Sequence, residues 1–290
     1  ALLPACQQQT ATEDTESTVS GAASVLLQNP ADFEQTDALV VLTRQQIEKV
    51  AGEISAGMVP VVMDSTGNYL PSQADDLNNN GQWDEMAFLA SLPAGASVSL
   101  ALQLVPASEV PRFTKRTAVH FGRRDAEDDT LRSVERAVLI RKLPTYNRNQ
   151  VDGPAWENDH IGFRMYFDGR NAFDVFGKRT SEMVLHTVGY DENKQPVDNY
   201  HEMEDWGRDV LSVGNSLGAG GLAMLENDQL YRLGIALGTP EDVTDTTAFE
   251  LTTTGPVRSL FTLTYMGWEV AGNRYEVKEI IGIPAGKHYY

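Results

Sequence analysis

Tyrosine, histidine and carboxylate side chains crowd one short segment of the chain. The stretch NYHEMEDWGRD places Tyr200, His201, Glu202 and Asp205 beside Trp206. Carboxylates favour the charged form of a nearby imidazole, which then works as base or acid near neutral pH, and a phenol is a second proton donor. Two alternatives stay open: a metal ligated by His201, Glu202 and Asp205, and an acidic surface loop in a chain that is acidic throughout.

A second group of polar side chains alternates with apolar ones in the stretch WENDHIGFRMYF. If residues 156–167 form one strand, successive side chains point to opposite faces. The core face is then Ile161, Phe163, Met165 and Phe167, and the other face is Trp156, Asn158, His160, Arg164 and Tyr166. This second face would suit a sugar acid, because aromatic rings stack on sugars and arginine offers a fork to a carboxylate. Alternation alone favours a plainer alternative, a solvated polar face on which Arg164 pairs with Glu157 or Asp159.

Oxygen-bearing side chains recur at alternate positions in DLNNNGQWDE, which is the pattern of a calcium loop. The prospective ligands are Asp76, Asn78, Asn80, the carbonyl of Gln82 and Asp84, and a glycine permits the sharp turn. The twelfth position of an EF-hand would be Ala87, so Asp84 or Glu85 would have to close the shell. The alternative is an Asx-rich turn whose side chains bond their own backbone. If calcium binds here, we expect its role to be structural.

These candidates need a scaffold, and the hydropathy pattern predicts one made of strands. Short runs of β-branched and aromatic residues are separated by Gly, Pro, Asn and Asp, which predicts an all-β, sandwich-like fold with few helices. The expected strands are residues 25–27, 39–42, 60–63, 98–104, 161–167, 183–188, 257–265 and 274–283. Segment 119–142 carries mixed charges that fit a helix or a strand connection, and a weak boundary signal lies at 106–117.

Composition excludes several classes of function. The 290 residues hold 23 Lys and Arg against 41 Asp and Glu, a net charge of −18. This balance argues against nucleic acid as a partner and against a polybasic membrane surface, both of which need clustered basic residues. Cys6 is the single cysteine, which excludes an intramolecular disulfide framework and a cysteine-rich zinc site.

The two ends of the sequence carry their own expectations. Residues 1–6, ALLPAC, resemble the end of a bacterial lipoprotein signal, and the polar segment 7–22 is expected to be a disordered linker. The β domain is expected to span residues 23–290 and to continue past its last residue. The predicted location is periplasmic or on the outer membrane, with membrane contact only through a lipid on Cys6.

Several segments together resemble one family. They are WENDHIGFRMY, FDVFGKR, YHEMEDWGRDVLSVGNSLGAGG, GPVRSLFTLTY and the opening VPVVMDSTGNYLPSQADDLNNNGQWDEMAFLA. The resemblance is to DUF4861, a family found in polysaccharide-utilisation clusters of Bacteroidetes-type bacteria, over roughly residues 24–290. His160 and Phe176 stand where the family more often has Arg and Trp. By analogy with mutarotase-like sugar enzymes, the sandwich is expected to be of the supersandwich kind.

The resemblance also implies an activity. One type of member, in ulvan-degrading bacteria, is described as a dehydratase that removes water from a non-reducing-end glucuronate or iduronate and leaves an unsaturated uronate. That elimination needs a base, an acid and a group that neutralises the carboxylate. His201 and Tyr200 are the expected base and acid, in either order, and the clamp is expected from Arg164 with Lys178, Arg179 or Arg258. The other expected substrate contacts are Trp156 as a stacking platform, Asn158, Tyr166, Asp205 and Trp206.

Other functions stay open beside this one. A polysaccharide lyase would run the same proton abstraction and expel a glycosidic oxygen, and a glycoside hydrolase would need two opposed carboxylates. A carbohydrate-binding surface lipoprotein without chemistry would also fit the tryptophans. The expected partner is an anionic oligosaccharide and no cofactor beyond calcium is required, although the net charge of −18 mildly opposes an anionic substrate.

Overall fold

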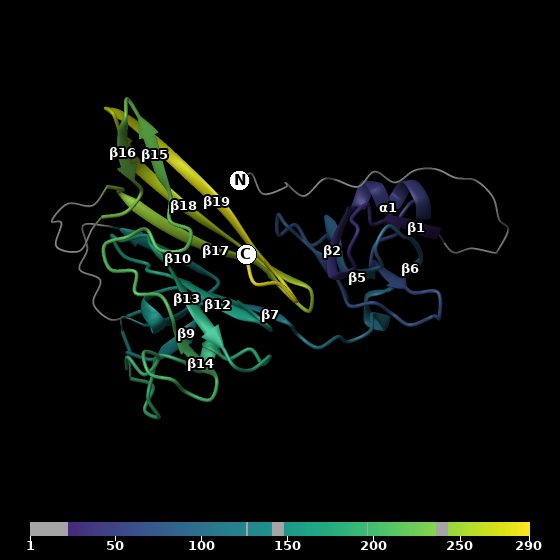
Figure 1. Ribbon diagram of the computed structural model, residues 1–290, viewed down its shortest axis with the longest axis horizontal. Helices are drawn as coiled ribbons and strands as arrows, with labels where there is room; N and C mark the ends of the chain where they lie inside the picture. The colour runs from purple at the N-terminus through teal and green to yellow at the C-terminus, as the bar shows by residue number, and fades with distance from the viewer. Residues whose placement is uncertain (1–22, 126, 141–147, 196, 236–242) are drawn as a thin grey trace. The chain divides into compact units, whose positions relative to one another are not determined.

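The chain folds into two compact units. The computed structural model describes residues 23–125, 127–140, 148–195, 197–235 and 243–290, so the expected lipid site at Cys6 and the linker 7–22 lie outside the described residues. The units are Ala1–Thr114 and Lys115–Tyr290, and the division falls inside the 106–117 segment (Figure 1). No helix in the described ranges is long and apolar enough to cross a membrane.

The first unit is a small sandwich of two antiparallel sheets. One sheet has the order β1 (Ala23–Gln28), β6 (Ser97–Pro106), β3 (Met58–Met63), and the other β2 (Gln35–Thr43), β5 (Glu85–Leu92), β4 (Ser72–Asp75). A short 3-10 turn, η1 (Ala107–Glu109), follows β6. Helix α1 (Arg44–Ala51) begins with a capping box, in which Thr43 and Gln46 satisfy each other's backbone N–H groups. Its one buried residue, Ile47, joins Leu27, Phe88 and Leu102 in the core of this unit.

The second unit contains a five-stranded and a four-stranded antiparallel sheet. The first has the order β14 (Gly207–Asp209), β13 (Phe173–Lys178), β12 (Ile161–Met165), β11 (Ala155–Asn158), β7 (Thr117–His120). The second has the order β10 (Arg136–Ile140), β17 (Thr246–Thr254), β18 (Arg258–Val270), β19 (Asn273–Pro284). Two short hairpins, β8 (Gly122–Arg124) with β9 (Leu131–Ser133) and β15 (Ala223–Glu226) with β16 (Gln229–Arg232), complete the strands that the structure describes.

The two large sheets share one apolar core. Phe163 and Phe173 from the five-stranded sheet pack in the same cluster as Phe249, Phe261 and Leu263 from the four-stranded sheet. Alternation explains the layer, because every second side chain of a strand turns to the same face. Burial of these rings from both sides supplies most of the hydrophobic stabilisation of the unit. The chain is therefore mostly β and sandwich-like, as the sequence predicts.

The prediction of one strand over residues 156–167 is wrong. The chain turns back after Asn158, whose side-chain oxygen accepts the N–H groups of His160 (2.8 Å) and Ile161 (3.0 Å). Strands β11 and β12 then pair with Trp156 directly opposite Phe163. Because opposed residues share a face, Trp156 belongs to the core and not to the polar face of Arg164.

Two other segments resolve differently from their sequence patterns. The undecided segment 119–142 is a run of short strands as far as it is described, and residues 141–147 lie outside the description. The strand expected at 183–188 is wrong, because this segment forms a 3-10 turn, η3 (Leu185–Thr187). The buried Glu157 carboxylate accepts the N–H of Leu185 at 2.7 Å, a tertiary contact that no local pattern encodes.

Candidate functional site

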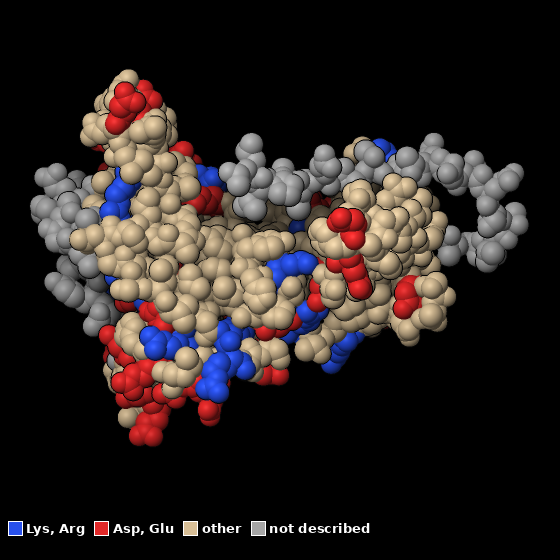
Figure 2. All heavy atoms as spheres, viewed as in Figure 1, with Lys and Arg blue, Asp and Glu red and all other residues tan. Residues whose placement is uncertain are grey.

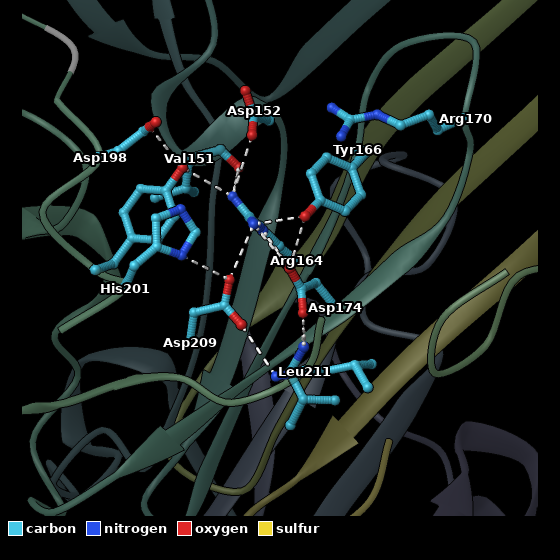
Figure 3. Close-up of polar contacts among 12 residues, drawn as sticks. Val151, Asp152, Arg164, Tyr166, Arg170, Asp174, Asp198, His201, Asp209 and Leu211 are labelled. Atoms are coloured by element: carbon cyan, nitrogen blue, oxygen red, sulfur yellow. Dashed lines mark hydrogen bonds and ion pairs between the residues drawn. The ribbon is translucent and has the colours of Figure 1, made fainter. Parts of the chain in front are cut away.

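A polar cluster lies on the face of the five-stranded sheet opposite the sandwich core. On β12, Arg164 alternates with the core residues Phe163 and Met165 and therefore points to this other face. Asp174 is its registered neighbour on β13, and Asp209 ends β14 one strand further along. Figure 3 shows Arg164 at the centre of the group, with carboxylates and phenols around it.

The guanidinium of Arg164 is held entirely by the chain itself. It donates from Nε to Asp174 (3.0 Å), from Nη1 to the Val151 carbonyl (3.3 Å), Asp152 (3.2 Å) and Tyr200 (3.0 Å), and from Nη2 to Tyr166 (2.7 Å), Asp174 (2.7 Å) and Asp209 (3.3 Å). Its side chain is 1% exposed. All three nitrogens are used, so this geometry does not support Arg164 as a direct clamp for a substrate carboxylate.

Aromatic rings enclose the same charge. The Cζ atom of Arg164 lies 4.4 Å from the ring centre of Tyr166, 4.8 Å from that of Tyr200 and 5.4 Å from that of Phe176. Each ring face attracts the cation electrostatically, and more strongly where water is excluded. Burial disfavours the charge, but the phenols and Asp174 outweigh it and raise the pKa of Arg164. Arg164 therefore stays cationic and fixes the positions of the groups around it.

One member of the cluster is open to solvent. The His201 side chain is 54% exposed, and its Nδ1 lies 3.4 Å from Oδ2 of the buried Asp209. Its ring centre is 4.7 Å from that of Tyr200. A carboxylate on Nδ1 orients an imidazole and stabilises its protonated form, as in catalytic His–Asp pairs. Nε2 has no hydrogen-bond partner among the described residues, so it is the nitrogen available for proton transfer.

The Tyr200 phenol connects the exposed and buried parts of the cluster. It accepts from Arg164 and donates to Asp198 at 3.1 Å. Burial raises the pKa of Tyr200 to about 12, although the neighbouring Arg164 charge acts in the opposite direction. At neutral pH the phenol therefore keeps its proton, which makes Tyr200 a donor rather than a base.

The carboxylates outnumber the cation at the centre. Asp152, Asp174 and Asp209 all contact Arg164. Burial raises the pKa of Asp209, and the nearby charge of Asp174 adds to that effect. Burial likewise raises the pKa of Asp152, in spite of the opposing charge of Arg164. The cluster therefore has excess negative charge and would repel a second anion placed directly in it.

A strained turn presents part of the cluster. In the 3-10 segment η2 (Gln150–Asp152), Val151 has φ 45° and ψ 35° and Asp152 has φ 64°. A β-branched residue at positive φ costs on the order of 1–3 kcal/mol and persists only where its surroundings enforce it. The buried Gln150 amide supplies that support by donating to the carbonyls of His186 (3.1 Å) and Val188 (2.5 Å).

Gln150 also connects this turn to a histidine that sequence reasoning missed. Because its amide nitrogen donates, its oxygen must accept from Nε2–H of His120 at 2.9 Å, which fixes the tautomer. Burial lowers the pKa of His120 and so favours the neutral ring. The ring of His186 lies 6.3 Å from it, centre to centre. The only sequence signal was HFGRR, at the start of the undecided mixed-charge segment.

Several predicted substrate contacts lie elsewhere. Trp156 is fully buried and stacks on Phe163, with ring centres 5.8 Å apart, so it offers no platform to a sugar. Asn158 is also fully buried, and its amide donates to the carbonyls of Pro284 (2.6 Å) and Lys287 (2.7 Å). Both residues hold the sandwich together, and neither side chain is accessible to a sugar in this structure.

The remaining predicted cations are also not gathered into a clamp. Lys178 forms a buried ion pair with Glu157 at 2.5 Å, with both side chains at most 3% exposed. Arg258 is buried at the start of β18. Arg179 is exposed and next to β13, and its N–H donates to the Trp206 carbonyl. Among the described residues, neither Lys178 nor Arg179 forms a hydrogen bond or an ion pair with the His201 cluster.

Trp206 and Asp205 flank the cluster without joining it. The Trp206 ring packs edge-on against Phe176, with centres 5.9 Å apart, and Asp205 is exposed. Across the described ranges, no group of three or more His, Cys, Asp or Glu side chains is placed to hold a metal. The alternative of a metal site at His201, Glu202 and Asp205 therefore finds no support.

The expected calcium loop lies in the first unit as an Asx-rich turn. Asp76 accepts the backbone N–H groups of Asn78 (3.3 Å), Asn80 (3.1 Å) and Gly81 (2.7 Å). Asn80 accepts the N–H of Gln82 at 2.8 Å, and the Asn78 amide donates to both oxygens of Asp84 at 3.0 Å. To bind calcium, these oxygens would have to give up their present hydrogen bonds to backbone N–H groups. The calcium site stays a prediction.

Comparison with known families bears on the whole chain. The sequence profile of DUF4861, a domain of unknown function, matches residues 27–290. The chain belongs to the DUF4861 family. No curated protein and no solved structure matches, so the mutarotase-like form of the sandwich stays a prediction for this DUF4861 chain. The match spans both units, so the polar cluster and the turn around Gln150 lie within the family's own sequence.

Proposed function

We propose that this DUF4861 protein is a carbohydrate-active dehydratase. It would remove water from a non-reducing-end uronic acid of ulvan-type oligosaccharides and leave an unsaturated uronate. The observation that carries the proposal is the pair of neighbouring contacts His201–Asp209 and Tyr200–Arg164. An oriented imidazole with a free nitrogen beside a protonated phenol supplies the base and the acid that such an elimination needs.

The geometry favours one order for the two roles. His201 Nε2 takes the proton from the carbon that bears the carboxylate, and the electron pair forms the double bond to the neighbouring carbon. The hydroxyl on that neighbour leaves with the proton of Tyr200 and becomes water; because Tyr200 is 2% exposed, this step requires the segment around His201 to open toward the substrate. Asp209 stabilises the imidazolium that forms, and Arg164 stabilises the phenolate left on Tyr200 at 3.0 Å. Proton transfer from His201 back to Tyr200, directly or through water, restores the starting state.

The substrate carboxylate must be neutralised outside the cluster. The proton next to it is weakly acidic, so a cation or donor has to meet the charge that develops on the carboxylate. Arg164 is already saturated, and three carboxylates surround it. The proposal therefore requires a further basic site near His201 and Tyr200.

The test uses uronate-terminated oligosaccharides, including ulvan-derived ones. Ultraviolet absorbance reports the unsaturated uronate, and mass spectrometry weighs the products. We expect new absorbance with loss of one water and no chain cleavage, abolished in His201→Ala and retained in His160→Ala, a matched exposed histidine in the β11–β12 turn. Shorter products would make the protein a polysaccharide lyase using the same residues. No absorbance with any substrate would contradict both and leave carbohydrate binding without chemistry.

A further inference from the structure

A buried arginine on the β8–β9 hairpin has donors that no residue in the described part of the chain uses. Arg124 is 6% exposed, and its Nη1 contacts the carbonyl (2.7 Å) and the carboxylate (3.3 Å) of Asp129. Its Nε and Nη2 atoms are buried and have no hydrogen-bond partner in the structure. A buried donor without an acceptor costs free energy, so this edge of the guanidinium is suited to a ligand that brings an acceptor.

The unused edge has the geometry of carboxylate recognition. Nε–H and the adjacent Nη2–H lie on one side of the planar guanidinium and point in parallel. This is the fork that binds both oxygens of a carboxylate, and a lysine at the same place could not reproduce it. Asp129 occupies the other nitrogen from a position that is 74% exposed, so the existing ion pair leaves the fork free.

Further basic and polar groups surround this edge. Arg124 lines a pocket together with Arg148, Gln150, Tyr190 and Lys194. Arg148 is tied to the hairpin because its carbonyl accepts the Arg124 N–H at 2.6 Å, and Nζ of Lys194 lies 3.9 Å from the centre of the Tyr190 ring. Three cations at one pocket stand out in a chain whose net charge is −18.

The residues that line the pocket include three cations and no carboxylate, although the acidic residues Asp125, Glu127, Asp128 and Asp129 follow Arg124 in the same hairpin. The side chain of Arg123, next to Arg124 on β8, forms no hydrogen bond or ion pair among the described residues, and burial followed by the charge of Arg148 lowers its pKa. In the part of the second unit where Figure 1 places β9 and β14, Figure 2 shows Lys and Arg side chains beside a dense group of acidic ones. A local basic site attracts an anion at contact distance even on an acidic protein, because salt screens the repulsion from the distant negative charges more than the nearby attraction.

The pocket is connected to the His201 cluster through the chain. Gln150 lines the pocket, and the two residues that follow it, Val151 and Asp152, contact Arg164. On the other side, the N–H of Gly189, a lining residue, donates to Asn199 at 3.0 Å, directly before Tyr200. A ligand in the pocket would therefore rest on the same two loops that hold the catalytic candidates.

We propose that the Arg124 pocket binds the carboxylate of an anionic sugar. The inference rests on the proposed function, because that chemistry requires a basic site and this one is connected to His201 and Tyr200 through the loops just described. The pocket as it stands has no room for a water molecule, so the exposed side chains of Arg148 and Lys194 move aside to admit the carboxylate. The fork of Arg124 then takes both carboxylate oxygens, while Arg148 and Lys194 contribute charge from the rim.

Binding is tested without turnover, by titrating the full chain with sodium D-glucuronate at constant ionic strength. The chain carries nitrogen-15 in its arginines, and the Nε–H signal of Arg124 is assigned by its loss in Arg124→Lys. We expect that signal to shift saturably with glucuronate and not with methyl glucoside. Sodium sulfate is the second anion, and we expect it to bind at least several-fold more weakly than the planar carboxylate.

Rim variants keep the test independent of the folding of Arg124 mutants. Arg148 and Lys194 are exposed, so Arg148→Gln and Lys194→Gln should fold, and each should weaken glucuronate binding at least threefold. Arg132→Gln is the matched control, because Arg132 lies on the same hairpin but is already paired with Asp125 and Asp128. It should leave the affinity unchanged.

The outcomes separate this proposal from the dehydratase itself. His201→Ala should bind glucuronate like the wild type while losing all turnover. If oligosaccharides are dehydrated but the Arg124 signal does not respond to glucuronate, the pocket assignment is wrong and the function stands. Preference for sulfate over glucuronate, or equal loss of affinity in Arg132→Gln, would also overturn the assignment.

Discussion

Two arginines in the second unit are buried to a similar degree, at 1% and 6% exposure, and are used in opposite ways. All three guanidinium nitrogens of Arg164 donate hydrogen bonds to carboxylates, phenols and a carbonyl of its own chain. Arg124 keeps one edge without a partner. A saturated guanidinium has nothing to offer a ligand and serves to place its neighbours, whereas an unsaturated one is a receptor for an acceptor that the chain does not provide.

Under the proposed function, this difference would give the two regions separate tasks. Around Arg164, the chain gathers more carboxylates than cations and excludes a second anion, which suits proton transfer by His201 and Tyr200. Among the residues that line the Arg124 pocket, three are cations and none is a carboxylate, which suits holding an anion. Elimination next to a carboxylate needs both functions, proton abstraction and neutralisation of the carboxylate charge.

The largest effect expected from this comparison is on stability. Arg164→Gln removes the partner of Asp174, which is fully buried, and leaves an uncompensated charge on the sheet. We expect the free energy of unfolding to fall by about 3–5 kcal/mol in urea denaturation followed by circular dichroism. Arg132→Gln, which breaks only exposed pairs, should change it by less than about 0.5 kcal/mol. A loss below about 1 kcal/mol for Arg164→Gln would show that Arg164 is not the organising charge.

The next largest effect separates two phenols that touch the same guanidinium. Tyr166 lies between Arg164 (2.7 Å) and Asp174 (2.8 Å), whereas Tyr200 lies next to His201 and contacts Asp198. Tyr200→Phe should lower kcat on an uronate-terminated oligosaccharide by about 10²-fold, because it removes the proton donor. Tyr166→Phe should leave kcat almost unchanged. Each should cost about 1–3 kcal/mol of unfolding free energy, the value of a hydrogen bond to a charged group. Equal losses of kcat would assign both phenols a structural role.

The sequence predicts the scaffold better than the site, for a physical reason. The alternation of apolar and polar residues predicts a strand wherever burial of a side chain depends only on its place along the strand, as in β18 (Arg258–Val270) and β19 (Asn273–Pro284). It fails at 156–167, because the Asn158 side chain caps a turn and restarts the alternation with the opposite phase. One reversal moves Trp156 from the expected ligand face to the core.

The site depends on contacts that are distant in the sequence. Tyr200 and His201 stand out as proton-transfer residues by type, and the structure places Tyr200 on Arg164, a pair 36 positions apart. The saturation of Arg164 cannot be predicted from its own strand, because its partners come from η2, β13 and β14. The free edge of Arg124 cannot be predicted from the sequence either. It depends on which acceptors the fold places near the guanidinium, and none of the described residues accepts from Nε or Nη2.

A smaller effect on stability is expected for Arg124, and a large one would contradict the contrast between Arg124 and Arg164. Because its Nε and Nη2 have no partner to lose and Asp129 stays solvated, Arg124→Gln should change the unfolding free energy by less than about 1 kcal/mol. Glucuronate should then distinguish the proteins. At 100 times its Kd, it should stabilise the wild type by about 2.7 kcal/mol and the variant far less, as measured by the shift in Tm. A strongly destabilised Arg124→Gln without glucuronate would make Arg124 a structural residue like Arg164.

The smallest effect is the pH dependence of stability, which compares the crowded Arg164 cluster with a simple ion pair. The pKa of Asp152 is raised by burial, so the native state holds a proton that the unfolded chain releases near pH 4. Stability from this group is therefore lost as pH rises from about 4, the ordinary pKa of the unfolded chain, through the native pKa, and Asp152→Asn should flatten that decline. Burial raises the pKa of Asp159, but the hydrogen bonds from the Gly286 N–H and from Arg116 outweigh burial, so the pKa is lowered. Asp159→Asn should therefore flatten only the loss of stability below about pH 4. The same slope in both variants, from urea denaturation at each pH, would show that the carboxylates around Arg164 are not in excess.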